Sequence, residues 1–477
     1  MKDNNYDFGM IGLGVMGSNL LLNMADNGFS VIGYDKDITK TELLKKSASK
    51  DTIVEGVNSL EEMVARLKTP RKLMMLVPAG NAVESVLNEL KPLLSKGDIV
   101  IDGCNSHYTD TLRRLNDLKN EGFHFMGIGI SGGEEGARRG PSIMPGGDME
   151  AYSKVAPILE SISAKVQGEP CVAYLGKGAA GHYVKMVHNG IEYAIMQLLS
   201  ECYDIMHHGL EMSNEEMHLV FKEWDGGEMK SFLIEITAAI FDQKDEKTGK
   251  YLIDVIADKA GAKGTGKWTS LEGLNLPMPI PTIDAAVMMR NLSSLNDERK
   301  AANELYRTTI EKIEISKEEF IPLLHDALYF ATIISYAQGL AMITTASKEL
   351  EMDIPVAKVV DVWRGGCIIR SALLGILKNS YQDESLPNIL LDRNIAELLQ
   401  DKLPAIQKIV SLAGGNNYAM AGLMSSLNYF NSYRRQFLPT NLIQAQRDFF
   451  GAHTYQRIDE EGFFHTEWQA GSGKPVK

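Results

Sequence analysis

An apolar run near the N-terminus, DFGMIGLGVMG, ends in three closely spaced glycines, Gly12, Gly14 and Gly17, and continues into a helical pattern. Glycines at this spacing let the chain turn sharply, let the backbone come close to a ligand, and let the following helix pack against the strand. The N-terminus of that helix attracts the negative charge of a phosphate. The segment therefore predicts a dinucleotide-binding turn between a first strand and a first helix.

An acidic residue follows the second predicted strand, SVIGYD. Asp35 lies 23 positions after Gly12, where a carboxylate accepts hydrogen bonds from the adenosine ribose and repels a 2′-phosphate. This position favours NAD as the cofactor. Lys36 follows directly and would attract a phosphate, so NADP stays open as the alternative. A solvated turn is the alternative to both roles.

Short apolar segments alternate with amphipathic stretches through the first part of the chain, as in KLMMLVPAG and DIVIDGCN. This alternation is typical of a doubly wound parallel sheet. After Gly178 the pattern changes to long helical stretches. We therefore expect an α/β N-terminal Rossmann-type domain over residues 1–178, a mostly α-helical domain with an internal duplication over residues 179–438, and a C-terminal tail over residues 439–477.

The helical part contains two similar segments. HNGIEYAIMQLL begins at His188 and HDALYFATIISY begins at His325, and both segments end in Trp-x-Gly-Gly, at Trp224 and Trp363. The offset between the copies is 137 residues at the histidines and 139 residues at the tryptophans. A duplication with a small insertion explains these paired endings better than chance similarity between two apolar helices.

The overall charge and the cysteines exclude several classes of protein. A net charge of −13 argues against a nucleic-acid partner, so an anionic substrate needs a locally basic pocket. The cysteines are scattered without a C-x-x-C pair, which is typical of reduced thiols in the cytoplasm rather than of disulfides or a zinc site. They are Cys104, Cys171, Cys202 and Cys367.

Membrane and export segments are not expected. The N-terminus is too acidic, and its apolar run too short, for a secretory signal. Residues 327–346 carry no charge over 20 positions, which is long enough to span a bilayer. This stretch also contains Thr332, Ser335 and Gln338, so we expect a helix buried inside a large domain, and a cytoplasmic protein.

Five polar residues share one face of the first long helical segment. Lys185, His188, Asn189, Glu192 and Tyr193 fall at helical positions i, i+3, i+4, i+7 and i+8. These side chains are costly to bury unless they meet a polar ligand. The second copy has neither a lysine nor a carboxylate at the corresponding positions, which favours function over structure for the lysine and the glutamate. An exposed salt bridge between these two is the alternative.

A second glycine-rich segment, GAKGTGKWT at residues 261–269, lies close to a P-loop pattern. Trp268 stands where a P-loop needs Ser or Thr, and an indole cannot bind magnesium. The free backbone N–H groups and the charges of Lys263 and Lys267 still favour a phosphate, without nucleotide hydrolysis. A flexible glycine turn is the alternative.

Small residues follow two other predicted strands, where open α/β sheets bind their ligands. The N–H groups of Ser131, Gly132 and Gly133 suit a carboxylate. Asn105, in the segment DGCNS, would hydrogen-bond either ligand, and an Asx turn is its alternative role.

Taken together, these segments resemble the decarboxylating 6-phosphogluconate dehydrogenase family, of the long dimeric type, over essentially all 477 residues. Its signatures follow one another in order as GLGVMG, IDGCNS, SGGEEGARRGPSIMPGG, KMVHNGIEY, KGTGKWT, RNLSSLNDER and IQAQRDFFGAHTY. The resemblance implies oxidative decarboxylation of 6-phosphogluconate to ribulose 5-phosphate and CO2 in the pentose phosphate pathway. It also implies a homodimer in which the C-terminal tail reaches into the partner subunit.

The resemblance further implies a role for each site residue. Lys185 would be the general base and later the acid, and Glu192 the acid that protonates the product carbon. The residues implied to bind the substrate are Asn105, Ser131, Gly132, Gly133, His188, Asn189, Tyr193, Lys263, Thr265 and Arg290, with Arg447 and His453 from the other subunit. The residues expected to bind the cofactor are Gly12, Gly14, Val15, Met16, Gly17, Asp35, Lys36, Val77, Ala79 and Asn105.

The residues after the second predicted strand differ from the pattern of the family. Family members commonly have Asn-Arg-Thr after the second strand to receive the 2′-phosphate of NADP, whereas this chain has Asp35-Lys36-Asp37. We therefore expect use of NAD, alongside or in place of NADP. Because the chain has no carboxylate cluster suited to an ion, we also expect a metal-independent reaction.

Three other classes of protein are weaker alternatives. A cofactor-sensing binding protein would lack Lys185 or Glu192, and both are present. A P-loop phosphotransferase is opposed by Trp268. Another 3-hydroxyacid dehydrogenase, such as the shorter 3-hydroxyisobutyrate type, would lack the second helical copy and the tail arginine.

Overall fold

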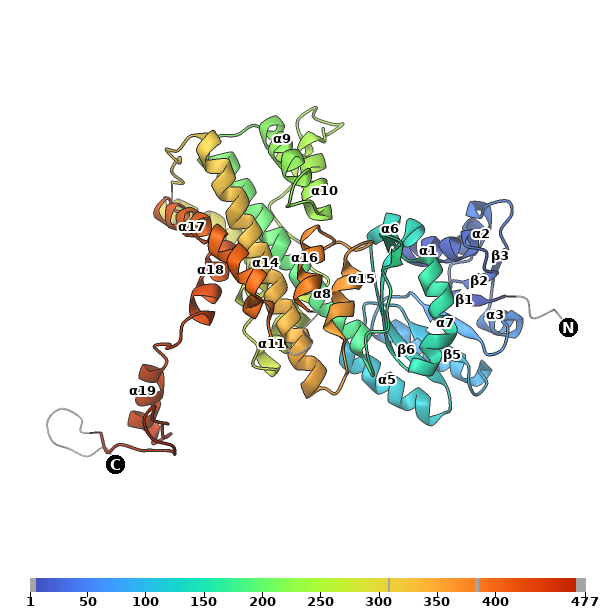
Figure 1. The fold of residues 1–477 in the computed structure, drawn as a ribbon. Helices are drawn as coiled ribbons and strands as arrows, with labels where there is room; N and C mark the ends of the chain where they lie inside the picture. The colour runs from blue at the N-terminus through green and yellow to red at the C-terminus, as the bar shows by residue number, and fades with distance from the viewer. Residues whose placement is uncertain (1–5, 308, 382–385, 469–477) are drawn as a thin grey trace. The chain divides into compact units, whose positions relative to one another are not determined.

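The computed structural model describes residues 6–307, 309–381 and 386–468 (Figure 1). The chain forms two compact units, Met1–Ser426 and Leu427–Lys477. The described part of the first unit contains a seven-stranded sheet in the order β3-β2-β1-β4-β5-β6-β7, parallel except for β7, which is antiparallel to β6. Its strands are β1 (Phe8–Ile11), β2 (Val31–Tyr34), β3 (Val54–Val57), β4 (Lys72–Met75), β5 (Ile99–Asp102), β6 (His124–Ser131) and β7 (Ser142–Gly147).

Helices connect the strands and cover both faces of the sheet. They are α1 (Val15–Asp26), α2 (Ile38–Ser47), α3 (Leu60–Arg66), α4 (Asn81–Leu90), α5 (Tyr108–Asn120), α6 (Gly133–Arg139) and α7 (Met149–Ile162). Because side chains alternate along a strand, Phe8 and Met10 of β1 join one buried cluster while Ile11 joins the other. The Rossmann-type fold predicted from the sequence is confirmed.

The rest of the described part of the first unit is mainly helical and also contains the short pair β8 (Lys165–Val166) and β9 (Glu169–Pro170). Its helices are α8 (Ala180–Asp204), α9 (Asn214–Asp225), α10 (Phe232–Asp242), α11 (Thr265–Asn275), α12 (Pro281–Ser293), α13 (Asn296–Tyr306), α14 (Lys317–Glu349), α15 (Val356–Trp363), α16 (Leu373–Ser380) and α17 (Arg393–Gly415). The two similar sequence segments each form a long helix followed by a shorter one, α8 with α9 and α14 with α15. The long helices α8 and α14 pack side by side (Figure 1).

Helix α14 contains the uncharged stretch 327–346. Among the described residues it is the one helix long and apolar enough to cross a membrane, and 94% of its most apolar window is buried inside the protein. The stretch is therefore packed against other parts of this chain, as expected of a core helix. All four cysteines are also buried, and none of them is bridged.

Helix α18 (Ala421–Tyr433) begins in the first unit, and α19 (Asn441–Gly451) belongs to the second. The second unit is organised around Asp448, whose side chain is fully buried. Its carboxylate accepts hydrogen bonds from Thr454 N and His465 Nδ1 at 3.0 and 2.9 Å, and from Thr466 N and Trp468 Nε1 at 3.0 and 2.8 Å. Burial alone would raise the pKa of Asp448, but these donors outweigh it and lower the pKa to about 2.

Candidate active site

The glycine-rich turn after β1 requires glycine at two positions and leaves the third open. Gly12 has φ of +95°, and a Cβ there would lie 2.4 Å from Leu76 O. A Cβ on Gly17 would lie 1.9 Å from Gly12 O. A Cβ on Gly14, the residue before α1, would meet nothing within 4 Å. The backbone at Gly14 is therefore open to the close approach of a ligand at the helix N-terminus.

A cavity of about 390 Å³ lies at this turn, where the strand order reverses between β1 and β4. Five of the expected cofactor residues line it, namely Gly12, Gly14, Asp35, Lys36 and Val77. The other five lie outside its lining: Val15, Met16, Gly17, Ala79 and Asn105. Sequence reasoning missed the remaining lining residues, Ile11, Tyr34, Lys40, Leu76, Pro78, Ala82 and Val86. Their only sequence signal is position, since most lie at or just beyond strand ends.

Asp35 has a structural role besides the one expected from its position. Its carboxylate accepts a hydrogen bond from Leu13 N at 2.8 Å and from Asp37 N at 2.9 Å. Lys40 Nζ lies 3.4 Å from both carboxylate oxygens. Asp35 therefore ties the end of β2 to the glycine-rich turn, while Lys40 balances its charge. Lys36 in turn pairs with Glu89 at 3.4 Å.

Glycines bring strand β6 and helix α8 into backbone contact. A Cβ on Gly181 of α8 would lie 2.3 Å from Gly127 O of β6. A Cβ on Gly129 would lie 2.4 Å from Lys185 Cβ. Because these positions have no side chain, α8 crosses directly over β6 and carries Lys185 to the end of the sheet where Ser131 lies.

Five of the predicted substrate-site residues meet at this point. His188 Nδ1 lies 3.5 Å from Lys185 Nζ, 3.1 Å from Asn189 Oδ1 and 3.8 Å from Glu192 Oε2. On the other side of the ring, His188 Nε2 lies 3.4 Å from Ser131 Oγ. Lys185 and His188 are both buried. Four of the five residues predicted to share this helix face therefore lie around the His188 ring, together with Ser131 of β6.

Burial is the largest cause of the pKa shifts in this group. It lowers the pKa of Lys185, with Glu192 and Cys367 acting in the opposite direction. It raises the pKa of Glu192, which Lys185 and Arg290 oppose. Burial, reinforced by the neighbouring Lys185, holds the pKa of His188 well below its usual value. Each of these pKa shifts is towards the uncharged form of its group, the direction that suits groups exchanging protons with a bound ligand.

The segment GAKGTGKWT forms the approach to α11 and the start of that helix. Gly264, with φ of +97°, precedes the first helical residue, Thr265. A Cβ on Gly266 would lie 2.5 Å from the ring of Tyr193, so α11 packs tightly on α8. The guanidinium carbon of Arg290 lies 3.4 Å from the centre of the same ring. Arg290 Nη1 also donates to Gly261 O at 3.1 Å.

Three predicted phosphate residues are therefore gathered at the N-terminus of α11, where the helix dipole and N–H groups favour an anion. They are Tyr193, Thr265 and Arg290, with the exposed Lys263 in the preceding loop.

Gly132 and Gly133 follow Ser131 with φ of +132° and +63°, and a Cβ on Gly133 would meet nothing within 4 Å. Arg447 and His453 belong to the second unit, where Arg447 Nη1 donates to Gln444 Oε1 at 3.2 Å. Their link to this site stays a prediction.

The second helical copy also contributes residues that sequence reasoning missed. Trp363, at the end of α15, packs against His188, and the buried Cys367 interacts electrostatically with Lys185. The carbonyl of Gly366 accepts a hydrogen bond from Ser142 N at 3.0 Å. The repeated Trp-x-Gly-Gly ending identified Trp363 as the equivalent of Trp224 in the other copy. It did not predict which residues Trp363 would contact.

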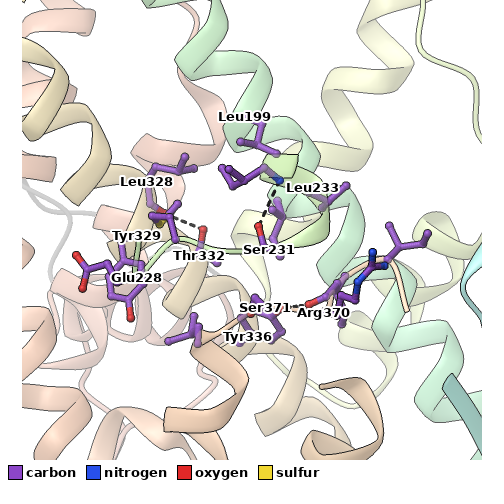
Figure 2. Close-up of a pocket in the computed structure, with 16 residues that line it drawn as sticks. Leu199, Glu228, Ser231, Leu233, Leu328, Tyr329, Thr332, Tyr336, Arg370 and Ser371 are labelled. Carbon is purple, nitrogen blue, oxygen red and sulfur yellow. Dashed lines mark hydrogen bonds between the residues drawn. The ribbon is translucent and has the colours of Figure 1, made fainter. Parts of the chain in front are cut away.

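An apolar hollow lies further along α8 (Figure 2). It is lined by Leu199, Leu233, Leu328 and Tyr336 among others, and its volume is about 20 Å³. That volume holds about one water molecule. Leu199 is 14 residues beyond Lys185, or roughly 21 Å along a helix. The hollow is therefore a packing gap and not part of the Lys185 site.

One trio among the described residues has the spacing of a metal site: Glu228, His325 and Asp326. The ammonium of Lys402 lies 2.9 Å from Glu228 Oε1 and 2.8 Å from Asp326 Oδ1. A cation is thus already supplied by the protein, and the trio forms an ion-paired cluster between α14 and α17.

The glycine turn of a Rossmann-type domain, followed by a helical domain with a buried group of lysine, histidine and glutamate, is the arrangement of a nicotinamide-dependent dehydrogenase. Two family models match the chain. The NAD binding domain of 6-phosphogluconate dehydrogenase matches residues 7–176, and the 6-phosphogluconate dehydrogenase C-terminal domain matches residues 181–468. The chain belongs to the 6-phosphogluconate dehydrogenase family.

Relatives of nearly the same length support this assignment. A protein of Bacillus subtilis (strain 168), named 6-phosphogluconate dehydrogenase, NADP(+)-dependent, decarboxylating, is 50% identical and covers 96% of this chain and 98% of its own. A decarboxylating 6-phosphogluconate dehydrogenase of Synechocystis sp. (strain ATCC 27184 / PCC 6803 / Kazusa) is 48% identical, covering 97% of both chains. The Plasmodium falciparum enzyme, solved without ligands, with its cofactor NADP+ and with its substrate 6-phosphogluconate, has a TM-score of 0.94, is 43% identical, and covers 97% of this chain and 100% of its own.

Proposed function

We propose that this protein catalyses the oxidative decarboxylation of 6-phosphogluconate to ribulose 5-phosphate and CO2, a step of the pentose phosphate pathway, with reduction of NAD or NADP. The observation that carries the proposal is the buried group around His188, in which Lys185 and Glu192 have opposite pKa shifts. In this proposal residues 1–178 bind the cofactor, residues 179–438 bind the substrate and form the dimer, and residues 439–477 form the tail.

The proposed chemistry uses one base and one acid. Neutral Lys185 removes the proton of the substrate C3 hydroxyl, and a nicotinamide bound at the Gly12 to Gly17 turn supplies the hydride acceptor. The resulting ketone lies β to the carboxylate, so CO2 leaves readily when protonated Lys185 donates its proton to the ketone oxygen. Glu192 then protonates C1 of the enediol, and Lys185 recovers a proton from the enediol hydroxyl.

The remaining predicted residues hold the substrate. The N–H groups of Ser131, Gly132 and Gly133 bind the carboxylate, while His188 and Asn189 orient the hydroxyl groups. Asn105 lies between the substrate and the nicotinamide. The phosphate is bound by Tyr193, Lys263, Thr265 and Arg290, and the gathering of Tyr193 and Arg290 at the N-terminus of α11 supports this role.

The active form is a homodimer in which Arg447 and His453 of each tail complete the phosphate site of the partner. Large apolar side chains that are exposed on each unit support an assembly that would cover them. In the first unit they include Leu274 and Leu305, at 77% and 74% exposure. In the second they include Phe450 and Phe463, at 72% and 76% exposure. The unbridged cysteines fit a reducing compartment, the cytoplasm.

NAD is the preferred cofactor in this proposal. A 2′-phosphate would meet the carboxylate of Asp35, and the two nearby lysines already pair with carboxylates, Lys40 with Asp35 and Lys36 with Glu89. We expect kcat/KM to be higher with NAD than with NADP. Asp35→Asn should lower the kcat/KM with NAD relative to that with NADP, because the amide oxygen still accepts the hydrogen bond from Leu13 N but the side chain has no charge. A wild-type protein that prefers NADP would contradict this preference while leaving the reaction unaffected.

The reaction itself is tested by following nicotinamide reduction with 6-phosphogluconate, NAD and NADP in parallel, with and without a chelator. We expect reduction with release of CO2 and ribulose 5-phosphate, unaffected by the chelator. Lys185→Met and Glu192→Gln should lower kcat by roughly 10² to 10⁴-fold each. Wild-type protein that reduces neither cofactor would overturn the proposed function, and a chelator that abolishes activity would overturn metal independence.

A further inference from the structure

Two equivalent histidine–tryptophan contacts join the two helical copies. His188 of the first copy packs against Trp363 of the second, with ring centroids 5.7 Å apart and planes at 73°. His325 of the second copy packs against Trp224 of the first, at 5.5 Å and 71°. Each histidine thus meets the tryptophan of the other copy in nearly the same T-shaped geometry, which is favourable for aromatic rings.

The surroundings of the two pairs differ completely. His188 is accompanied by Lys185 and Glu192, the proposed base and acid. His325 is accompanied by Asp326, 3.0 Å from its Nδ1, and by the ion pairs of Lys402. The same histidine–tryptophan contact therefore lies beside the proposed substrate site at His188 and beside an ion-paired cluster at His325.

Trp363 is held on more than one side. It is fully buried, and its Nε1–H points to Met144 Sδ of β7 at 3.4 Å. Its carbonyl oxygen accepts a hydrogen bond from Cys367 Sγ at 3.0 Å. These two contacts hold both the indole and the backbone of Trp363, so the ring that packs against His188 has a defined position.

The orientation of the His188 ring determines which side chains its two nitrogens can contact. In the observed orientation Nδ1 lies 3.5 Å from Lys185 Nζ, and Nε2 lies 3.4 Å from Ser131 Oγ. Both separations are near the limit of a hydrogen bond, so a small rotation of the ring would lose them. Trp363 contacts the ring without donating to it or accepting from it, so packing is what it contributes.

We propose that Trp363 is a positioning residue for the reaction, which holds the His188 imidazole between Lys185 and Ser131. This inference rests on the proposed function. In it, the second helical copy is needed to complete the active site carried by the first, and Trp224 is the equivalent residue with no part in catalysis.

The test compares Trp363→Leu with Trp224→Leu, and Trp363→Phe with Trp224→Phe, in the full-length protein. We expect Trp363→Leu to lower kcat at least 10-fold with little change in the KM for 6-phosphogluconate, and to shift the pH profile of kcat/KM. Trp363→Phe should recover part of the loss. The Trp224 variants should keep kcat within twofold of the wild type, although their melting temperatures fall by a similar amount.

A second measurement does not depend on turnover. The ring ¹⁵N signals of His188, assigned by their loss in His188→Gln, should change in Trp363→Phe and stay unchanged in Trp224→Phe. Equal losses of kcat in both tryptophan positions, or an unchanged kcat and His188 signal in folded Trp363→Phe, would overturn the inference. If Trp363→Leu does not fold, the Phe pair decides. Wild-type protein without activity would instead overturn the proposed function, and the NMR comparison would still test the contact.

Discussion

The indole of Trp268 meets the imidazole of His107 edge-on, with ring centroids 4.9 Å apart and ring planes at 89°. Trp268 lies in the first turns of α11, and His107 is the N-cap of α5, two residues after Asn105. Next to this pair, burial and a hydrogen bond to the buried Glu272 of α11 raise the pKa of Tyr108. The helix proposed to bind the substrate phosphate is therefore joined to the loop proposed to contact the nicotinamide.

Removing this contact should uncouple the two ligands. An aromatic pair contributes about 1 kcal/mol, or roughly a fivefold change in an equilibrium constant. We expect Trp268→Ala to reduce, by about that factor, the effect of 6-phosphogluconate on the affinity for NADH, measured by titration calorimetry. Trp268→Phe should retain most of the effect. An unchanged effect in the Ala variant would show that the contact carries no coupling.

Adding a methyl group to the strand beneath the proposed base should displace it. A Cβ on Gly129 would lie 2.4 Å from Lys185 Cβ, and a misplacement of about 1 Å lowers a rate by roughly 10²-fold. We expect Gly129→Ala to lower kcat by about that factor. Gly375→Ala is the control, because a Cβ there meets nothing within 4 Å. The close contact between β6 and α8 at Gly127, Gly129 and Gly181 forms a seam. Normal turnover of Gly129→Ala would mean that this seam accommodates the methyl group without moving Lys185.

The rate should depend on pH through two groups. In the proposed mechanism Lys185 must be neutral, so activity should fall as pH drops through its pKa. Glu192 must be protonated in the same mechanism, so activity should fall as pH rises through its pKa. Burial lowers the first pKa and raises the second, which enlarges the fraction of enzyme in the productive state. We expect a bell-shaped profile of kcat/KM whose limbs belong to the coupled pair. Glu192→Gln should leave a low activity that only rises with pH, and a persisting alkaline limb would contradict the assignment.

The same shift makes Lys185 a source of instability. Its pKa in the folded protein is lowered from 10.5, so the unfolded chain binds the proton more tightly and stability decreases as pH falls below that value. Lys185→Met should therefore raise the melting temperature at pH 7 and flatten its dependence on pH. Lys50→Met, at an exposed lysine, should change neither. A melting temperature lowered by Lys185→Met would show that packing outweighs the electrostatic term.

The C-terminal unit should depend on the charge of Asp448. Its carboxylate faces four donors, and an amide would place an N–H₂ group against them. We expect Asp448→Asn to speed hydrogen exchange at the amides of Thr454 and Thr466, whereas Asp459→Asn should not. Because the pKa is lowered to about 2, this ordering should persist above pH 4 and be lost as pH falls towards 2. Unchanged exchange in Asp448→Asn would contradict the role of the carboxylate.

The sequence predicted those features that a local pattern determines. The glycine turn, the alternation of strands and helices, and the buried uncharged helix follow from spacing and composition within one segment. So does the shared helix face of Lys185 and Glu192. The contact of His188 with Trp363 and the seam at Gly129 join distant parts of the chain. Such contacts depend on how helices pack on the sheet, and single-sequence patterns do not report packing.

Asp35 illustrates a second limit. Its position after β2 identified it as a residue near the ribose, but position alone could not show that Leu13 N already donates to it. Nor could it show that Lys40, in the first turn of α2, faces the same carboxylate. The chemical type of a residue was predictable, whereas the share of its hydrogen-bonding capacity already used by the fold was not.

The seam between β6 and α8 also limits how this enzyme can move. A Cβ on Gly181 would lie 2.3 Å from Gly127 O, so the two backbones touch at this point with no side chain between them. The sliding of packed side chains that shear motions require has no room there. A hinge at the seam would open contacts that no side chain could refill. We therefore expect any closure around a substrate to occur outside the seam, for example in residues 257–264 before α11. The absence of side chains at this seam therefore predicts gating by a short loop rather than clamshell motion of two domains.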